Sequence, residues 1–177
     1  MLLGAAPIAS LQEPSKQARL CANIYPNARA DMLRRHNWNC AVWRVDLAPL
    51  AGTPPGGEWA HWFAMPGDWI RTLDVLPRGI DYDFEANRIL ADTNAITLRY
   101  VRNVGEALWD ANLVAAVIAR MVKELAYPIT RSASLAQLKA AEYVEALRAA
   151  KTADGQERPP ESIDDEGGSP FIAARGR

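Results

Sequence analysis

The side chains able to carry out chemistry are few and widely spaced in this 177-residue chain. Its two histidines, His36 and His61, have no HxxxH, HExxH or CxxC neighbour, so a metal site would have to assemble from distant positions. The two cysteines, Cys21 and Cys40, also lack a short metal-ligand spacing, and we expect free, buried thiols. The sequence therefore predicts no metal or cofactor site.

Paired carboxylates are the other candidates for catalysis. Asp81 with Asp83, and Asp164 with Asp165, have the residue type needed for general acid and base in glycoside cleavage. Such a pair also needs a cleft with two different environments, and we interpret these aspartates as solvated strand and tail charges. The chain contains no GxSxG, GxxxxGK[ST] or GxGxxG motif. A role other than catalysis is favoured, and a peptidoglycan hydrolase using Asp81, Asp83 or Asp68 is a weaker alternative.

The charge balance excludes a strong general attraction to nucleic acid. Twenty Lys and Arg residues stand against 21 Asp and Glu, a formal net charge of −1. Arg29, Arg34 and Arg35 cluster locally and could contact phosphate or an acidic partner, but we favour a solvated face with pairing to Asp31. A DNA-binding packaging factor is the least favoured reading. No run approaches the roughly 18 apolar residues of a membrane span, and the N-terminus lacks secretory features, so we expect synthesis in the cytoplasm and no membrane contact.

Apolar periodicity predicts helices at both ends of residues 15–153. The first spans 15–37, and Pro26 should kink it near Tyr25 or divide it in two. The second begins at Asp110 and stops at Tyr127, before Pro128, and a third follows Ser134 to about residue 154. The second helix is expected to bury two apolar ridges. The first ridge consists of Leu113, Val117, Met121 and Leu125, and the second of Val114, Ile118 and Val122. The third helix is expected to have its apolar side at Leu135, Leu138, Ala141, Val144 and Leu147.

Residues 38–104 have the Trp, Tyr, Ile, Val, Gly and Pro content typical of strands and turns. Strands at 62–65 and 70–76 flank a turn signal at 66–68, and strands at 81–90 and 96–101 flank another at 92–94. The predicted fold class is α+β, mainly α. It comprises one domain over 1–155, with a helical bundle from 15–37 and 108–153 and an antiparallel β-hairpin or sheet inserted at 38–104.

Six tryptophans are conspicuous in a chain of this size. A stacking surface for bases or sugars would need interleaved basic residues, and only Arg44 and Arg71 lie near these tryptophans in the strand region. Packing in the core or between subunits is favoured instead. The candidate subunit-interface residues are Trp43, Trp59, Trp62 and Trp69.

Residues 156–177 are expected to form an extended C-terminal arm, since most of them are charged, Gly, Ser or Pro. The last eight residues add Phe171, Ile172, Arg175 and Arg177, an apolar and basic tip. A tether with such a tip is typical of a segment that orders on a partner. These four residues are the candidate arm for binding a partner, either a second protein or an adjacent subunit.

The order of short segments along the chain resembles the tail tubular protein A family, the head-to-tail adaptor, neck or gatekeeper subunits of short-tailed bacteriophages. The segments are PIASL at 7–11, YPNAR at 25–29, LRRHNWNCA at 33–41, FAMPGDWIR at 63–71, ILAD at 89–92, LRYV at 98–101, WD at 109–110 and AAKTAD at 149–154. None is specific alone, and the likeness covers residues 4 to 157.

The resemblance implies a structural protein of the virion neck, present in the host cytoplasm before assembly. Its copies would form a ring of about twelve, a heterologous assembly in which each subunit needs two different patches. The ring would dock beneath the portal protein, extend the DNA channel without sequence-specific contact, and carry the tail nozzle or a tail tubular protein B-like protein. The C-terminal arm would bind the portal protein or an adjacent subunit. A neck or head-completion protein of a long-tailed phage is the alternative.

Overall fold

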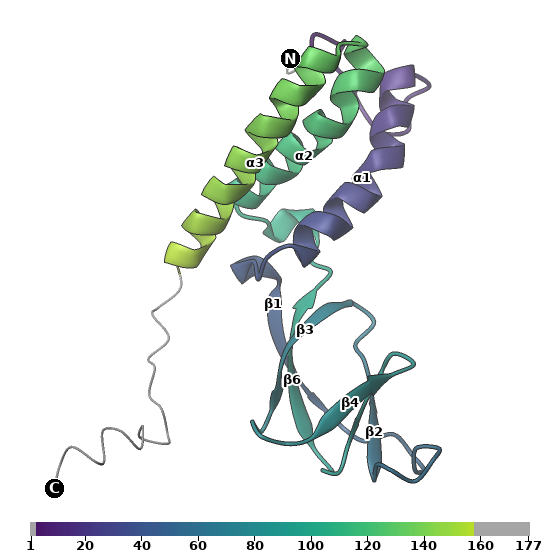
Figure 1. Cartoon of the computed structure of the whole chain (residues 1–177). Helices are drawn as coiled ribbons and strands as arrows, with labels where there is room; N and C mark the ends of the chain where they lie inside the picture. The colour runs from purple at the N-terminus through teal and green to yellow at the C-terminus, as the bar shows by residue number, and fades with distance from the viewer. Residues whose placement is uncertain (1–2, 158–177) are drawn as a thin grey trace, which may run out of the picture.

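A computed structural model describes residues 3–157 and shows a mixed α+β protein (Figure 1). Three helices lie together at one end, and the strands form the other end. The helices are α1 (Lys16–Arg34), α2 (Ala111–Thr130) and α3 (Ala133–Gln156), and all six strands fall between α1 and α2 in the sequence. The order of elements is therefore the predicted one, a β region inserted between helices that pack together.

Helix α1 is a single helix despite Pro26, so the expectation of two consecutive helices is wrong. Ser15 caps its first turn, where the Oγ accepts a hydrogen bond from the backbone N–H of Ala18 at 3.1 Å. Pro26 is exposed, so water can reach the carbonyl that the proline leaves without a helical donor. The helix can continue through the proline at that position.

The boundary between α2 and α3 differs from the prediction. Helix α2 starts where expected, with the Asp110 carboxylate accepting from the N–H of Leu113 at 2.8 Å, but it continues through Pro128 to Thr130. Arg131 then takes a left-handed conformation with φ of 56° and ends the helix. The cap of α3 is Ser132 and not Ser134.

The helices bury only part of the predicted apolar faces. The first ridge of α2 is buried at Leu113, Val117 and Leu125, but Val114 and Ile118 of the second ridge are exposed. On α3, the prediction is right only in part: Leu147 packs against the core, but the buried positions are Tyr143, Ala150 and Asp154, whereas Leu138 and Val144 face solvent. Aromatic Tyr143 fits into the gap between α1 and α2, where its hydroxyl lies 3.5 Å from the Met32 sulfur, and this contact sets the rotation of α3.

Six strands form two antiparallel three-stranded sheets. The strands are β1 (Val42–Leu47), β2 (His61–Ala64), β3 (Trp69–Leu76), β4 (Tyr82–Glu85), β5 (Arg88–Ala91) and β6 (Ile96–Arg102). Sheet A has the order β1-β6-β3, and sheet B the order β2-β5-β4.

The strands that flank the two predicted turn signals do not pair with each other. The segments at 66–68 and 92–95 carry the chain from one sheet to the other, because β2 and β3 belong to different sheets, as do β5 and β6. The tight hairpin lies inside the predicted strand 81–90, where Ala86 and Asn87 both have positive φ, of 44° and 64°. Two central residues with positive φ give the turn that matches the twist of paired strands.

Strand β6 connects two hydrophobic cores. Its Val101 belongs to the core of the helical end, with Met32, Trp38, Leu113 and Tyr143. Its Leu98 and Tyr100 belong to the core between the sheets, with Phe63 and Ile89. Successive side chains of a strand point to opposite faces, so one strand serves both cores.

Candidate interaction surfaces

The four tryptophans predicted at a subunit interface lie on both sheets and do not form one patch. Trp43 on β1 is 49% exposed, and the Arg102 guanidinium lies 4.4 Å from its ring centre. Trp62 lies on the opposite face of β2 from buried Phe63, under the guanidinium of Arg88 at 4.2 Å. Trp59, half-buried, lies in the loop that precedes β2.

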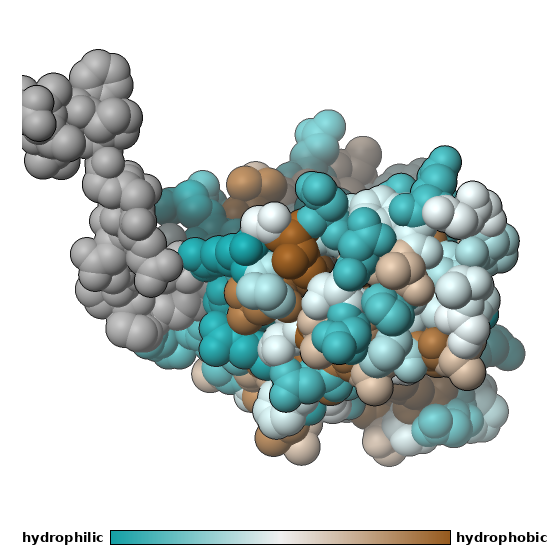
Figure 2. All heavy atoms as spheres, turned by 90° about the horizontal axis from the view of Figure 1, so that it is seen from below, coloured by the Kyte–Doolittle hydropathy of each residue, from teal (hydrophilic) through white to brown (hydrophobic). Residues whose placement is uncertain are grey.

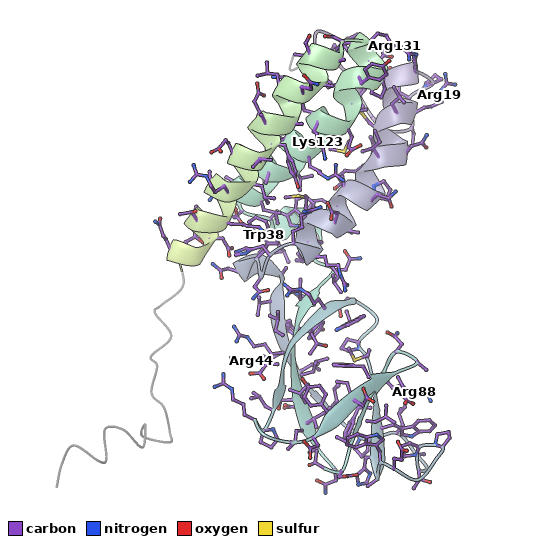
Figure 3. The ribbon with its side chains drawn as sticks, in the orientation of Figure 1. Arg19, Trp38, Arg44, Arg88, Lys123 and Arg131 are labelled. Atoms are coloured by element: carbon purple, nitrogen blue, oxygen red, sulfur yellow. The ribbon has the colours of Figure 1, made fainter. Side chains whose placement is uncertain are left out.

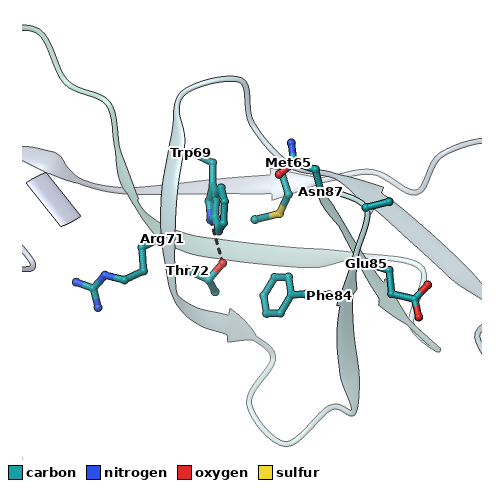
Figure 4. A pocket seen from close by; sticks show the side chains of 8 residues that line it. Met65, Trp69, Arg71, Thr72, Phe84, Glu85 and Asn87 are labelled. Atoms are coloured by element: carbon teal, nitrogen blue, oxygen red, sulfur yellow. Dashed lines mark hydrogen bonds between the residues drawn. The ribbon is translucent and has the colours of Figure 1, made fainter. Parts of the chain in front are cut away.

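Trp69 lines a hollow of about 360 Å³ where the edges of the two sheets approach each other (Figure 4). Its indole N–H donates to the Thr72 Oγ1 at 3.1 Å, which fixes the ring across the opening. The hollow is lined by Met65, Trp69, Arg71, Thr72, Phe84, Glu85, Ala86 and Asn87. Of the four tryptophans, only Trp69 borders this hollow.

The remaining two tryptophans hold the two ends of the molecule together. Trp38 is fully buried where the helices meet the strands (Figure 3), and its indole N–H donates to the Met32 carbonyl at 2.8 Å. Trp109 is half-buried, and its indole N–H donates to the Val104 carbonyl at 3.2 Å.

Helices α2 and α3 leave large apolar side chains exposed, and one of these, Ile118, lines a shallow groove between the two helices. Val114 and Ile118 of α2 are 38% and 47% exposed, and Leu138 and Val144 of α3 are 54% and 59% exposed. The groove, of about 260 Å³, is lined by Ala115, Ile118, Ala119, Val122, Lys139 and Glu142. The Lys139 ammonium and the Glu142 carboxylate lie 2.8 Å apart there. We call Val114, Ile118, Leu138 and Val144 the outward helical residues.

Seen from the strand end, apolar atoms form separate patches among hydrophilic ones (Figure 2). That face shows no single broad apolar surface among the described residues. The exposed apolar side chains are instead spread over the helical end and the strand end of the molecule. Those on the strands include Trp43, Tyr82 and Phe84.

The basic cluster on and after α1 bonds to the protein itself. Arg35 pairs with Asp31 at 2.8 Å, as preferred from the sequence. Arg29 instead pairs with Glu106 at 2.9 Å, and Arg34 donates to the Ile70 carbonyl at 2.7 Å, so these two bind the segments after α1. The predicted pairing with Asp31 is therefore wrong for Arg29 and Arg34, although Arg34 is exposed to solvent as predicted.

Carboxylates on α1 and α2 share these cations. Arg120 of α2 contacts Asp31 at 3.2 Å and also Glu124. Burial raises the pKa of Asp31, but hydrogen bonds from Arg35 and Arg120 outweigh it and hold the pKa below its ordinary value. The hydrogen bond from Arg120 is the main cause that lowers the pKa of Glu124. This network joins α1 to α2.

A buried aspartate, which sequence analysis did not single out, fixes the end of α3 beside the start of β1. Asp154 is 2% exposed, and its carboxylate accepts from the N–H of Asn39 at 2.8 Å and lies 2.9 Å from the His36 Nε2. The Asn39 side-chain amide donates to the Asp154 carbonyl at 2.8 Å. The only signal in the sequence was its position at the end of an Ala-rich helix.

The candidate catalytic carboxylates lie in different environments. Asp81 and Asp83 are exposed at the β4 edge, whereas Asp68 accepts a hydrogen bond from the Tyr100 hydroxyl at 2.9 Å. Burial and then this hydrogen bond raise the pKa of Tyr100 to about 12, so the pair is a structural contact at neutral pH. Asp164 and Asp165 lie outside the described residues, as do the arm residues Phe171, Ile172, Arg175 and Arg177.

Within residues 3–157, no group of three His, Cys, Asp or Glu side chains is placed to hold a metal ion. Cys21 and Cys40 are free thiols, as predicted, but they are half-buried and not fully enclosed. Burial raises the pKa of both thiols, so both are protonated at neutral pH. In the same part of the chain, no helix has the length and apolar content that a membrane span requires.

No protein-family model matches this chain, and no curated protein matches its sequence. The function is therefore inferred from the order of segments, the fold and these surfaces.

Proposed function

We propose that this protein is a head-to-tail adaptor of a bacteriophage neck. In this role, about twelve copies form a ring that docks beneath the portal protein, extends the DNA channel and carries the tail nozzle. The chain then acts as a helical bundle with an inserted antiparallel β element and a C-terminal arm. It has no catalytic part in this role, and DNA passes through the ring without being read.

The order of elements supports this proposal. One helix, a strand region and two further helices follow one another, which is the architecture that the resemblance to tail tubular protein A implies. The quoted segments also fall at structurally important places. The segment 33–41 contains the core tryptophan Trp38, and 149–154 contains the buried Asp154 that closes α3 onto it.

The observation that carries the proposal is the outward direction of apolar side chains on α2 and α3. Four large apolar side chains on these helices, the outward helical residues, are each more than a third exposed. A further apolar hollow, beside Trp69 and Phe84, lies at the strand end. Two different apolar sites on one chain are what a heterologous ring requires of each subunit.

The ring can bind the portal tightly even if the contact made by each subunit is weak. A ring presents many copies of each contact to the portal at once, so a weak interaction per subunit becomes strong by avidity. The arm adds reach, at the cost of ordering a flexible segment on binding.

The test is to image the purified full-length protein alone and after mixing with purified portal protein. We expect ring-shaped additions coaxial with the portal, and co-sedimentation of the two proteins. A neck protein of a long-tailed phage would also form rings, and it is distinguished by binding a tail-completion protein in place of a nozzle. A protein that neither binds the portal nor forms rings would contradict both readings, and release of soluble fragments from peptidoglycan would favour the hydrolase.

A further inference from the structure

Strand β4 is an open edge of sheet B. Within the described residues it pairs with β5 on one side, and its other side has no strand. All four of its residues are exposed. Tyr82 and Phe84 project from the same face, with their rings 5.5 Å apart in an edge-to-face contact, and they are 40% and 44% exposed. An open edge with exposed aromatic side chains is a common acceptor for an extended segment.

The hollow beside Trp69 opens next to this edge. Phe84 enters it from β4, Trp69 faces Phe84 from β3, and Met65 closes the space between them (Figure 4). Arg71 points away from the hollow in the same view, and its guanidinium donates to the Asn37 side chain. The walls nearest the opening are therefore apolar and aromatic, and they suit a large apolar side chain.

Acidic side chains alternate with these aromatic ones along the strand, and one of them, Glu85, borders the hollow. Asp81, Asp83 and Glu85 fall within five consecutive positions and are all exposed. Arg88 lies opposite Glu85 in the hairpin, but its guanidinium lies over the ring of Trp62 on β2. The site thus joins an apolar hollow to a negatively charged edge.

The end of this chain has the complementary chemistry. Residues 170–177 read PFIAARGR, with Phe171 and Ile172 followed by two arginines and no acidic residue. An aromatic ring suits the hollow, and Arg175 and Arg177 suit the carboxylates beside it. Residues 158–177 form the one long stretch outside the described part of the chain. The candidate occupant is therefore a segment of this same chain and not a separate protein.

Helix α3, which precedes this segment in the chain, ends on a different side of the body from the acceptor. Asp154 anchors the end of α3 beside Asn39, which shortly precedes β1, and β1 and β3 are the two opposite edges of sheet A. The hollow lies at the β3 edge, and Figure 1 shows the end of α3 and strand β4 on opposite sides of the molecule. A donor on one side and an acceptor on the other is the arrangement that links successive copies head to tail.

We propose that residues 170–177 of one copy bind along β4 of a second copy, with Phe171 in the hollow beside Trp69 and the arginines against Asp81 and Glu85. This inference rests on the proposed ring only in requiring that copies of the chain meet. It names the acceptor of the arm and adds a second contact between copies to the one proposed for the outward helical residues.

The first experiment titrates a fluorescently labelled peptide of residues 168–177 into the full-length protein and follows anisotropy. The protein carries Phe171→Ala, so that its own arm does not compete. We expect saturable binding, weakened about tenfold or more by Phe171→Ala in the peptide. The paired substitution Asp81→Lys and Glu85→Lys should also weaken binding several-fold, and a peptide with Arg175→Glu and Arg177→Glu should recover it.

The control for each single substitution, Asp81→Lys or Glu85→Lys, is Asp46→Lys, at an exposed aspartate on β1, an edge strand of sheet A. It changes the net charge in the same direction and should leave peptide affinity unchanged. Equal loss with this control, or equal binding of the Phe171→Ala peptide, would overturn the proposed site.

The second experiment decides which copy is bound. Phe171→p-benzoylphenylalanine protein is irradiated as a mixture of isotopically light and heavy full-length chains. Mixed light-heavy crosslinks to Met65, Trp69 or Phe84 are expected. Crosslinks to these residues confined to one chain would overturn binding to a second copy, and crosslinks only elsewhere would overturn the acceptor. Portal binding is imaged in a separate experiment. A protein that forms these crosslinks but does not bind the portal would contradict the adaptor proposal and leave the proposed arm contact standing.

Discussion

Residues of the same type serve opposite purposes in this protein, and the tryptophans show it. Trp38 is fully buried, with its indole N–H satisfied by the Met32 carbonyl and its ring in edge contact with His36. Trp43 is about half exposed and lies against a single arginine. Burial and a satisfied polar atom make Trp38 a part of the fold, whereas Trp43 remains free to contact a partner.

Trp38→Ala should therefore lower the free energy of unfolding by about 3–5 kcal/mol, because it leaves a large cavity where helices and strands meet. Trp43→Ala is the matched control, and its cost should be about 1 kcal/mol or less. Urea denaturation followed by circular dichroism measures both. Similar losses for the two variants would contradict the assigned roles. If Trp38→Ala does not fold, Trp38→Phe should give a smaller loss in the same direction.

At the scale of elements, arginine–carboxylate contacts join α1 to its neighbours. Asp31 binds Arg35, which follows the last residue of α1, and Arg120 on α2, and the Glu106 carboxylate accepts from the Tyr25 hydroxyl at 2.6 Å. The hydrogen bond from Tyr25 is the largest cause that lowers the pKa of Glu106. The pKa values of Asp31, Glu106 and Glu124 are all lowered in the folded chain.

A lowered folded-state pKa means that the carboxylate stabilises the fold when ionised. That contribution is complete above the unfolded-state pKa, roughly 4 for these groups, and is lost as the pH falls through the folded-state pKa. Asp31→Asn should thus cost about 1 kcal/mol at pH 7 and clearly less at pH 3. Urea denaturation at the two pH values is the measurement. Glu145→Gln, in an exposed pair with Arg148, is the control and should change little at either pH. A cost for Asp31→Asn that does not depend on pH would contradict the account.

For the whole molecule, the exposure of apolar side chains on the surface bears on whether the protein remains a monomer or assembles. The outward helical residues contribute little to the core of a single chain, since each is more than a third exposed. Their loss should therefore affect association and not folding.

Ile118→Glu is expected to abolish ring formation with the portal, because a charge would be buried at the subunit contact. The thermal midpoint should stay within a few degrees of the parent protein, since an exposed position loses little on substitution. Electron microscopy and differential scanning calorimetry give the two readouts. Ala149→Glu, at an exposed position of α3 away from the groove, is the control and should leave rings intact. Normal rings from Ile118→Glu would remove the helical contact from the proposal.

Local patterns in the sequence were sufficient for the succession of elements. Helical spacing from Ser15 and Asp110 depends on caps and apolar periodicity within one segment, and both starts were predicted correctly. The mixed α+β class and the strand region between the helices follow from the same kind of local information. The free state of Cys21 and Cys40 was also predicted from their spacing.

Tertiary contacts alone decided how those elements pair and which faces they bury. The turn signals at 66–68 and 92–94 mark a change of chain direction, but the partner of a strand depends on contacts with residues far along the chain. The apolar stripe of α3 through Leu138 and Val144 has helical spacing whether or not a neighbour covers it, and the burial of Tyr143 and Asp154 rotated it outward. The hollow between Trp69 and Phe84 likewise exists only because two sheet edges meet, since packing between distant segments creates a site that no single segment encodes.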